Sequence, residues 1–174
     1  MKEIKKKVKK KVFFGYKTKK GFTKTGYGSN LTIELFHVLK EYQQPDPYVP
    51  EISWYEFRRK QIRHTGEPTP KTGTILHGPY KRIVGDQIVE EGMYYIGTKH
   101  GRWMTYDRND VLVNKEYYHK GWPKESLVRY YDEQFTRLKE VIPRKYGKME
   151  GTYFYFHENG EVAVKGEYRN NSKV

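Results

Sequence analysis

Six histidines are the side chains of this 174-residue chain that most directly suggest chemistry, because an imidazole can bind a metal or transfer a proton near neutral pH. His77 and His100 each precede a glycine at matching points of two similar segments, so internal repetition explains both. The other four show neither H-x-x-x-H nor H-E-x-x-H spacing; they are His37, His64, His119 and His157. We therefore predict no metal site and no cofactor.

Acid–base and nucleophilic chemistry has equally little support in the sequence. The chain has no cysteine, no glycine-rich phosphate loop and no G-x-S-x-G motif. Glu90 and Glu91 are adjacent and would project to opposite sides of a strand. Asp107, Asp132 and His157 share one position just after a predicted strand, where capping of a turn is the simpler explanation. The residues predict a protein that is not an enzyme.

Positive charge is concentrated in the first residues of the chain, whose net charge is +13. Residues 1–24 contain eleven lysines and one acidic residue, whereas 25–77 are neutral overall and 78–174 carry +3. We predict a basic N-terminal extension over 1–24 that is solvated and mobile. A phosphate-binding arm for nucleic acid or anionic lipid is the alternative. Its anion-binding candidates are Lys5, Lys6, Lys7, Lys9, Lys10 and Lys11.

Aromatic residues are unusually abundant, with 17 Tyr, 8 Phe and 3 Trp. Such rings favour half-buried sheet surfaces, where one edge packs and the other stays hydrated. No stretch approaches the roughly 20 apolar residues that a transmembrane helix needs. The composition therefore predicts an all-β protein that does not span a membrane.

An internal repeat organises the C-terminal part of the chain. Segments that begin at Gly78, Gly101, Ser126 and Gly151 align at offsets of 23, 25 and 25 residues. Each contains two polar–apolar runs around a turn rich in Asp, Asn and Gly, which predicts a β-hairpin. Because hairpins at a nearly constant period stack side by side, we predict an extended single-layer antiparallel sheet of consecutive β-hairpins over 74–174.

Two columns of rings recur in this array. They lie two and five residues after the small position, so they should occupy opposite faces of the sheet. We expect Trp103 to be the most buried ring, because it has a neighbouring unit on each side. The first column holds Tyr80, Trp103 and Tyr153, the second holds Tyr106, Tyr131 and Phe156, and the small positions are Gly78, Gly101 and Gly151.

Residues 25–73 form a separate predicted region. The run 31–42 fits either an amphipathic helix or a strand, and its β-branched and aromatic content favours the strand. Its predicted hairpin partner is 51–62, beyond the proline-rich segment 43–50. A loop over 66–73 joins this hairpin to the array.

The clearest repeat unit, residues 94–106, reads Y-x-x-G-x-x-H-G-x-W-x-x-Y, and related spacing recurs as G-x-x-x-G-x-Y-x-x-F over 147–156. This pattern resembles the MORN repeat, in the variant form common in bacterial proteins. The resemblance covers about residues 74 to 174. The third unit departs from it, with Ser126 in place of glycine and one extra residue between Gly121 and Ser126.

The resemblance implies a non-catalytic protein-binding or scaffolding module of a larger bacterial assembly, since MORN-variant proteins include antitoxin-like and envelope-associated members. It favours the periplasm or cell envelope, with the cytoplasm as the alternative. The partner would be another protein, bound through the aromatic sheet face or edge. Rings that no neighbouring unit buries are the binding candidates, unless they pack under the 31–62 hairpin. They are Tyr94, Tyr95, Tyr117, Tyr118 and Trp122.

Overall fold

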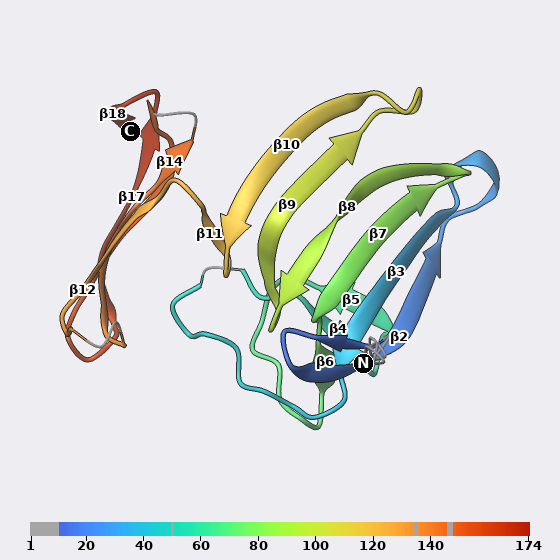
Figure 1. The fold of residues 1–174 in the computed structure, drawn as a ribbon, viewed down its shortest axis with the longest axis horizontal. Helices are drawn as coiled ribbons and strands as arrows, with labels where there is room; N and C mark the ends of the chain where they lie inside the picture. Colours follow the sequence, from blue (N-terminus) through green and yellow to red (C-terminus); the bar gives the residue numbers. More distant parts are fainter. Residues whose placement is uncertain (1–10, 50, 134–135, 146–147) are drawn as a thin grey trace, which may run out of the picture.

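The computed structural model describes residues 11–49, 51–133, 136–145 and 148–174, which form antiparallel β-sheets without an α-helix. An eight-stranded sheet and a five-stranded sheet lie side by side (Figure 1). A three-stranded sheet packs against the larger one. The prediction of an all-β fold is confirmed.

Strand order in space follows chain order through most of the large sheet. In order of pairing, the eight-stranded sheet contains β1 (Val12–Phe13), β2 (Tyr16–Thr25), β3 (Thr32–Leu39), β7 (Gly78–Val84), β8 (Gln87–Tyr95), β9 (Thr98–Tyr106), β10 (Leu112–His119) and β11 (Trp122–Pro123). The five-stranded sheet contains β12 (Leu127–Tyr130), β13 (Leu138–Ile142), β16 (Gly151–Phe156), β17 (Val162–Arg169) and β18 (Ser172–Lys173). The three-stranded sheet contains β5 (Gln61–Arg63), β4 (Trp54–Glu56) and β6 (Gly73–Ile75), and β14 (Arg144–Lys145) pairs with β15 (Lys148–Met149).

The predicted strand at 31–42 is confirmed as β3, but its partners differ from the prediction. β3 pairs with β2 along its whole length on one side and with β7, the first strand of the array, on the other. The segment 51–62 instead contributes β4 and β5 to the three-stranded sheet. The predicted 31–62 hairpin is therefore wrong, because β2 lies closer in sequence and closes a shorter loop through the 3-10 turn Gly28–Asn30.

The prediction of a basic extension over 1–24 is wrong from Val12 onward, because β1 and β2 belong to the sheet. Within β2, Thr18 and Thr23 are buried while the lysines are exposed, so the lysine-rich composition concealed a strand of the fold. Lys11 is the one predicted anion-binding lysine among the described residues, and its carbonyl oxygen accepts the Thr18 N–H at 2.8 Å. Outside the described residues lie Lys5, Lys6, Lys7, Lys9 and Lys10.

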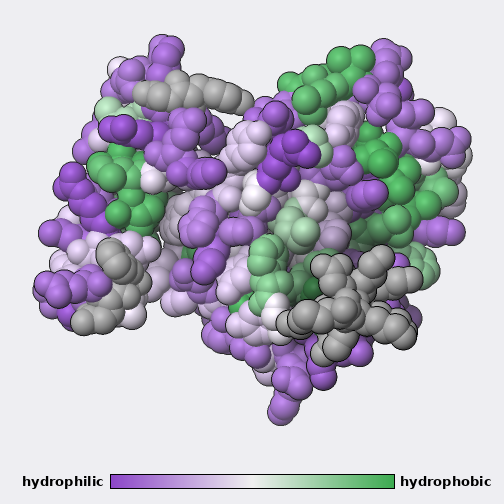
Figure 2. Space-filling model, viewed as in Figure 1, coloured by the Kyte–Doolittle hydropathy of each residue, from purple (hydrophilic) through white to green (hydrophobic). Residues whose placement is uncertain are grey.

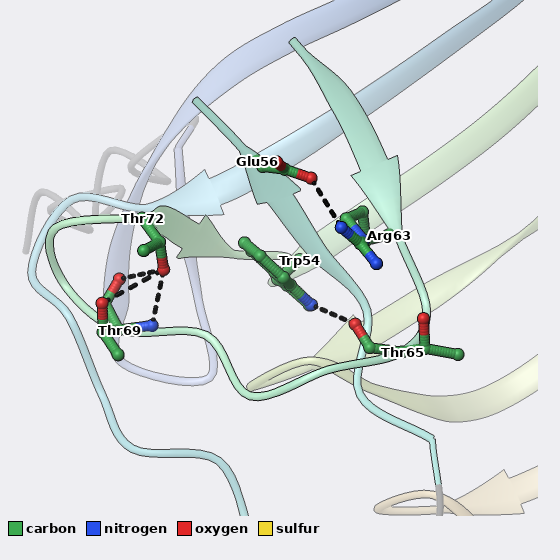
Figure 3. Close-up of polar contacts among 6 residues, drawn as sticks. All are labelled: Trp54, Glu56, Arg63, Thr65, Thr69 and Thr72. Atoms are coloured by element: carbon green, nitrogen blue, oxygen red, sulfur yellow. Dashed lines mark hydrogen bonds and ion pairs between the residues drawn. The ribbon is translucent and has the colours of Figure 1, made fainter. Parts of the chain in front are cut away.

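Trp54 anchors the three-stranded sheet (Figure 3). Its Nε1–H donates to the Thr65 carbonyl at 3.0 Å. Its ring lies against Gly73, where an added Cβ would come within 2.4 Å of the indole. Arg63 lies over the ring, 5.9 Å from its centroid, and pairs with Glu56 at 3.1 Å. The indole thus fixes all three strands of this sheet.

The main core lies on the face of the eight-stranded sheet that the three-stranded sheet covers, which we call the inner face. Trp103 packs there 4.9 Å from Tyr94 and 5.6 Å from Tyr80, between ring centroids. Trp103 is 4% exposed but Tyr94 only 2%, so the prediction that Trp103 is the most buried ring is narrowly wrong. One side of its indole meets the Lys99 ammonium, at 4.8 Å, instead of a neighbouring ring. The cluster comprises Phe36, Val38, Leu76, Tyr80, Tyr94 and Trp103.

The repeat array is divided between two sheets, so the prediction of one continuous sheet over 74–174 is wrong. β7 to β10 extend the large sheet, whereas β12, β13, β16 and β17 belong to the smaller one. The break falls between β11 and β12, at the unit where Ser126 replaces glycine. The five-stranded sheet has its own buried cluster, formed by Leu138, Val141, Phe154 and Phe156.

The ring columns lie on opposite faces within each sheet, but a different column is buried in each. Trp103 is in the core of the large sheet, while Tyr106 bonds to Glu91 on the other side. In the small sheet Phe156 is buried, whereas Tyr153 is half-buried and donates to Glu140 at 2.8 Å. Burial and this bond raise the pKa of Tyr153 to about 12. Once the array breaks, the second column covers the core.

Candidate functional site

Both repeat histidines cap hairpin turns. His77 Nδ1 accepts the Ile96 N–H at 2.9 Å, and His100 Nδ1 accepts the Lys120 N–H at 3.1 Å. Glu150 occupies the same position in the last unit and accepts the equivalent N–H at 2.7 Å. The capped residues have φ values of 40°, 44° and 51°, as tight two-residue hairpin turns require. The interpretation of these histidines as products of repetition is consistent with a structural role.

His77 is held in its neutral form. Because its Nδ1 accepts the Ile96 N–H, the ring proton lies on Nε2, which donates to the Phe13 carbonyl at 2.7 Å. Burial lowers the pKa of His77, against the smaller opposing effect of the Phe13 bond. Burial also lowers the pKa of His100, and the neighbouring His119 and Lys120 lower it further.

We expect the free energy of unfolding to fall as the pH is lowered from about 7 to about 5. A histidine whose pKa is lowered by folding takes up its proton in the unfolded chain first, so acid favours unfolding. The contribution of such a histidine to the free energy of unfolding is complete above the pKa of the unfolded chain, about 6.5. As the pH falls from there toward the lower pKa of the folded state, this contribution is lost at up to about 1.4 kcal/mol per pH unit. Urea unfolding across this range measures the slope. His77→Gln should flatten it and the exposed His157→Gln should not; an unchanged slope in His77→Gln would contradict the assignment.

The aspartates of the shared turn position also have structural partners. Asp107 Oδ1 accepts the Val111 N–H at 3.0 Å, and Asp132 Oδ1 accepts the Arg137 N–H at 3.0 Å, so their prediction as turn caps is confirmed. His157 closes its turn through its backbone N–H. Within the part of the chain that the structure describes, no three His, Cys, Asp or Glu side chains are grouped to hold a metal ion.

Of the five rings predicted to bind a partner, Tyr117 is exposed, at 47%. Tyr94 is a core residue, so the structure contradicts its choice as an exposed binding ring. Tyr95, Tyr118 and Trp122 are half-buried. Tyr95 packs edge-on against Phe14, Tyr118 against the inner-face core, and Trp122 against the core of the small sheet. Adjacent tyrosines differ in this way because they point to opposite faces.

Tyr117 and Tyr118 also line a pocket of about 200 Å³ between β10 and β14. Its carboxylate Glu116 accepts a hydrogen bond from Tyr118 Oη and lies 3.3 Å from Lys145 Nζ. Burial, followed by the Glu116 bond, raises the pKa of Tyr118 above its usual range. Glu116 is thus engaged in linking β10 of the large sheet to β14.

Carboxylates of the inner face are paired in the same way. Tyr80 Oη donates to Glu34 Oε2 at 2.6 Å, and Arg82 lies 3.7 Å from Glu90. Burial, followed by the Glu34 bond, raises the pKa of Tyr80 far above its usual range. The rings and acidic side chains of the inner face are therefore engaged in contacts within the fold.

The opposite face of the eight-stranded sheet, which we call the outer face, is open and basic. Strand register places five exposed cations from four strands on this face, together with one acidic residue, Glu91. Glu91 accepts a hydrogen bond from Tyr106 Oη at 2.9 Å. Apolar side chains lie between the charges. The cations are Lys20, Lys24, Lys81, Arg102 and Lys115, and the apolar residues include Phe22, Ile33, Leu35, Ile83, Met104 and Tyr117.

The outer face carries an open groove of about 470 Å³ across β2, β3 and β7. Figure 2 shows hydrophobic side chains gathered over this part of the sheet. Sequence reasoning missed the groove, because the lysines of β2 were assigned to a tail. The signal was the spacing of Phe22, two residues from both Lys20 and Lys24, which places the ring and both lysines on one face of a strand. Its side chains and backbone come from Lys20, Gly21, Phe22, Leu35, Phe36, His37, Pro79, Tyr80 and Lys81.

Comparison with known proteins gives no relative: no family model, curated protein or solved structure matches the chain. The resemblance to MORN repeats therefore stays a prediction. Among the described residues, no helix has the length and apolar character needed to cross a membrane.

Proposed function

We propose that this protein is a non-enzymatic binding module that recognises another protein through the outer face of its large sheet. The observation that carries the proposal is the exposure of apolar side chains at strand positions: Phe22 is 64% exposed, Leu35 43% and Tyr117 47%. Large apolar side chains grouped on an open surface mark interaction sites. A role as a scaffold or accessory of a bacterial assembly in the envelope follows only from the MORN resemblance and is part of this proposal.

Recurrent hairpin geometry supports a repeat architecture of this kind. The same backbone hydrogen bond recurs in three repeat units. In each, the second residue of a two-residue turn donates its N–H to the carbonyl of the residue that lies two positions before the repeat glycine. These bonds are Gly97 to Leu76 at 2.7 Å, Gly121 to Lys99 at 2.8 Å and Asn171 to Met149 at 3.1 Å. A module built from repeated hairpins presents an extended surface, which suits protein recognition.

Binding of a phosphate polymer or anionic lipid is the second candidate, and the basic outer face favours it. Lys20, Lys24 and Lys81 are exposed on this face, so the folded part of the chain has cationic surface of its own, in addition to the lysines of the N-terminal segment. Phosphate binding by several lysines should weaken steeply as salt rises. A contact centred on apolar side chains should respond much less.

Deleting residues 2–10 should leave partner capture at physiological salt intact, because the outer face remains complete without them. The deletion stops before β1, since removal through residue 20 would destroy the pairing of β2 with β3. Affinity isolation with the full-length and shortened proteins, followed by identification of what is captured, measures the effect. The charge-reversed full-length variant Lys71→Glu, at an exposed loop residue, controls for net charge. Complete loss on deletion would favour the basic-arm function instead.

A further inference from the structure

The groove on the outer face exists because two strands diverge. β3 and β7 pair as far as Leu35↔Lys81 and meet again at the isolated bridge Val38↔Leu76. Between these points, residues 36–37 of β3 lie opposite residues 77–80, so the second strand takes a longer path. Pro79 lies in this longer path and has no backbone N–H to close the ladder. The divergence leaves a depression in the sheet at this point.

Phe22 and Leu35 give the groove an apolar wall. They are directly opposite each other on β2 and β3, yet 64% and 43% of their surfaces stay exposed. Phe22 lies next to Gly21, whose neighbour on the inner face is the Phe36 ring, so the backbone beneath the groove is fixed by the core. A rigid apolar wall beside a depression has the form of a pocket for a partner's anchoring side chain.

The rim of the groove is cationic. Lys20 and Lys81 line it, Lys24 follows on the same face of β2, and no acidic residue lines it. Within the described ranges, none of these lysines lies within ion-pair distance of a carboxylate. His37 responds to this charge: burial lowers its pKa, and Lys20 and Lys11 lower it further. Glu91, opposite Lys81 on β8, accepts a hydrogen bond from Tyr106 instead, so among the described residues the rim lysines have no carboxylate partner.

We propose that the groove binds an extended protein segment in which an apolar side chain is flanked by acidic residues. This inference rests on the proposed function and specifies its site and the chemistry of its partner. The apolar side chain packs against Phe22 and Leu35, and the flanking carboxylates meet Lys20 and Lys81. Apolar packing supplies the anchor, while the complementary charges select the partner and speed its association.

A fluorescent seven-residue peptide with a central leucine and three acidic residues on each side tests the proposal by anisotropy. Binding should weaken by about tenfold or more in Phe22→Ser and in Lys81→Glu, since each removes one half of the recognition. The matched controls Tyr27→Ser and Lys71→Glu, at exposed residues outside the groove, should bind within about twofold of the natural protein. All four changes are at exposed residues, and an unchanged unfolding midpoint verifies each fold.

Peptide changes test the ligand side. Replacing the leucine with serine, or the acidic residues with their amides, should each weaken binding by about tenfold. Equal binding by the amide peptide, by Phe22→Ser or by Lys81→Glu would overturn the proposal. So would displacement of the peptide by a twelve-nucleotide oligothymidylate whose own binding depends on Phe22, which would assign the groove to nucleic acid. Two outcomes separate this proposal from the proposed function. If no peptide binds at millimolar concentration but Phe22→Ser retains partner capture, the groove proposal fails and the outer-face function stands. If the natural protein captures no partner, the proposed function itself fails.

Discussion

Trp103→Ala should lower the free energy of unfolding by about 3 to 5 kcal/mol, the cost of removing a large buried ring. The indole packs against Tyr80 and Tyr94 at the centre of the inner-face core. Its Nε1–H donates to the Met93 carbonyl at 3.0 Å, and this bond is lost as well. Chemical denaturation of the natural and substituted proteins measures the difference. Tyr27→Ala removes a ring that is 93% exposed and should change stability by less than about 0.5 kcal/mol.

A second substitution tests whether the ring occupies the position that the structure gives it. An added Cβ at Gly92 would lie 2.2 Å from Trp103 Cδ2 and 2.3 Å from Cε2, closer than packed carbons approach. Gly92→Ala alone should therefore cost about 1 to 3 kcal/mol through overpacking. In the Trp103→Ala background the methyl group enters vacated space, so most of this cost should disappear. An equal cost in both backgrounds would show that the indole does not lie over Gly92.

Hairpins, strand faces and turn caps could be predicted from the sequence, because each is determined by residues within a single repeat unit. Ring spacing around Trp103 and the turn residues Asp107 and Asp132 fixed hairpins, faces and turn caps, because these depend on period-two alternation and nearby hydrogen bonds. The strand at 31–42 was recognisable from its β-branched content for the same reason. Local patterns thus identify elements and their faces.

Pairing between distant strands could not be predicted in the same way. Nothing in the run 51–62 distinguishes a partner of β3 from a separate three-stranded sheet, since the choice depends on Trp54 packing against Gly73. The break in the array did coincide with a visible departure, Ser126 in place of glycine. A missing glycine shows where a repeat changes, but not how the chain continues.

The candidate site was hidden for a related reason. Lys20 and Lys24 look like members of a solvated tail until register pairs them with His37 and Ile33 across β2 and β3. Segment-by-segment charge counting also averages over two faces. The acids Glu34 and Glu90 lie on the inner face beside cations such as Arg82, whereas the outer face has five cations and the single acid Glu91. Counting charge by segment therefore conceals that one face of the sheet is strongly basic.

The large and small sheets each have a buried cluster with its own rings. The small-sheet core contacts the rest of the chain through the loop that follows β3, where the Tyr48 ring meets Phe156 edge-on at 5.2 Å. Trp122 meets Phe154 at 6.0 Å. These contacts are few compared with the ladders inside each sheet, so we expect the small sheet to open without the large one.

Phe156→Ala should remove about 3 to 5 kcal/mol of stability from the small sheet, because Phe156 is 2% exposed and stacks on Phe154. Hydrogen exchange resolves where the loss falls: protection of the β13 and β16 amides should decrease, while that of the β8 and β9 amides should stay unchanged. Val162→Ala, at a 51% exposed residue of the same sheet, is the matched control and should leave both sets unchanged. Equal loss of protection in both sheets would mean that the two cores unfold as one cooperative unit, and the outer face would then depend on the small sheet for its stability.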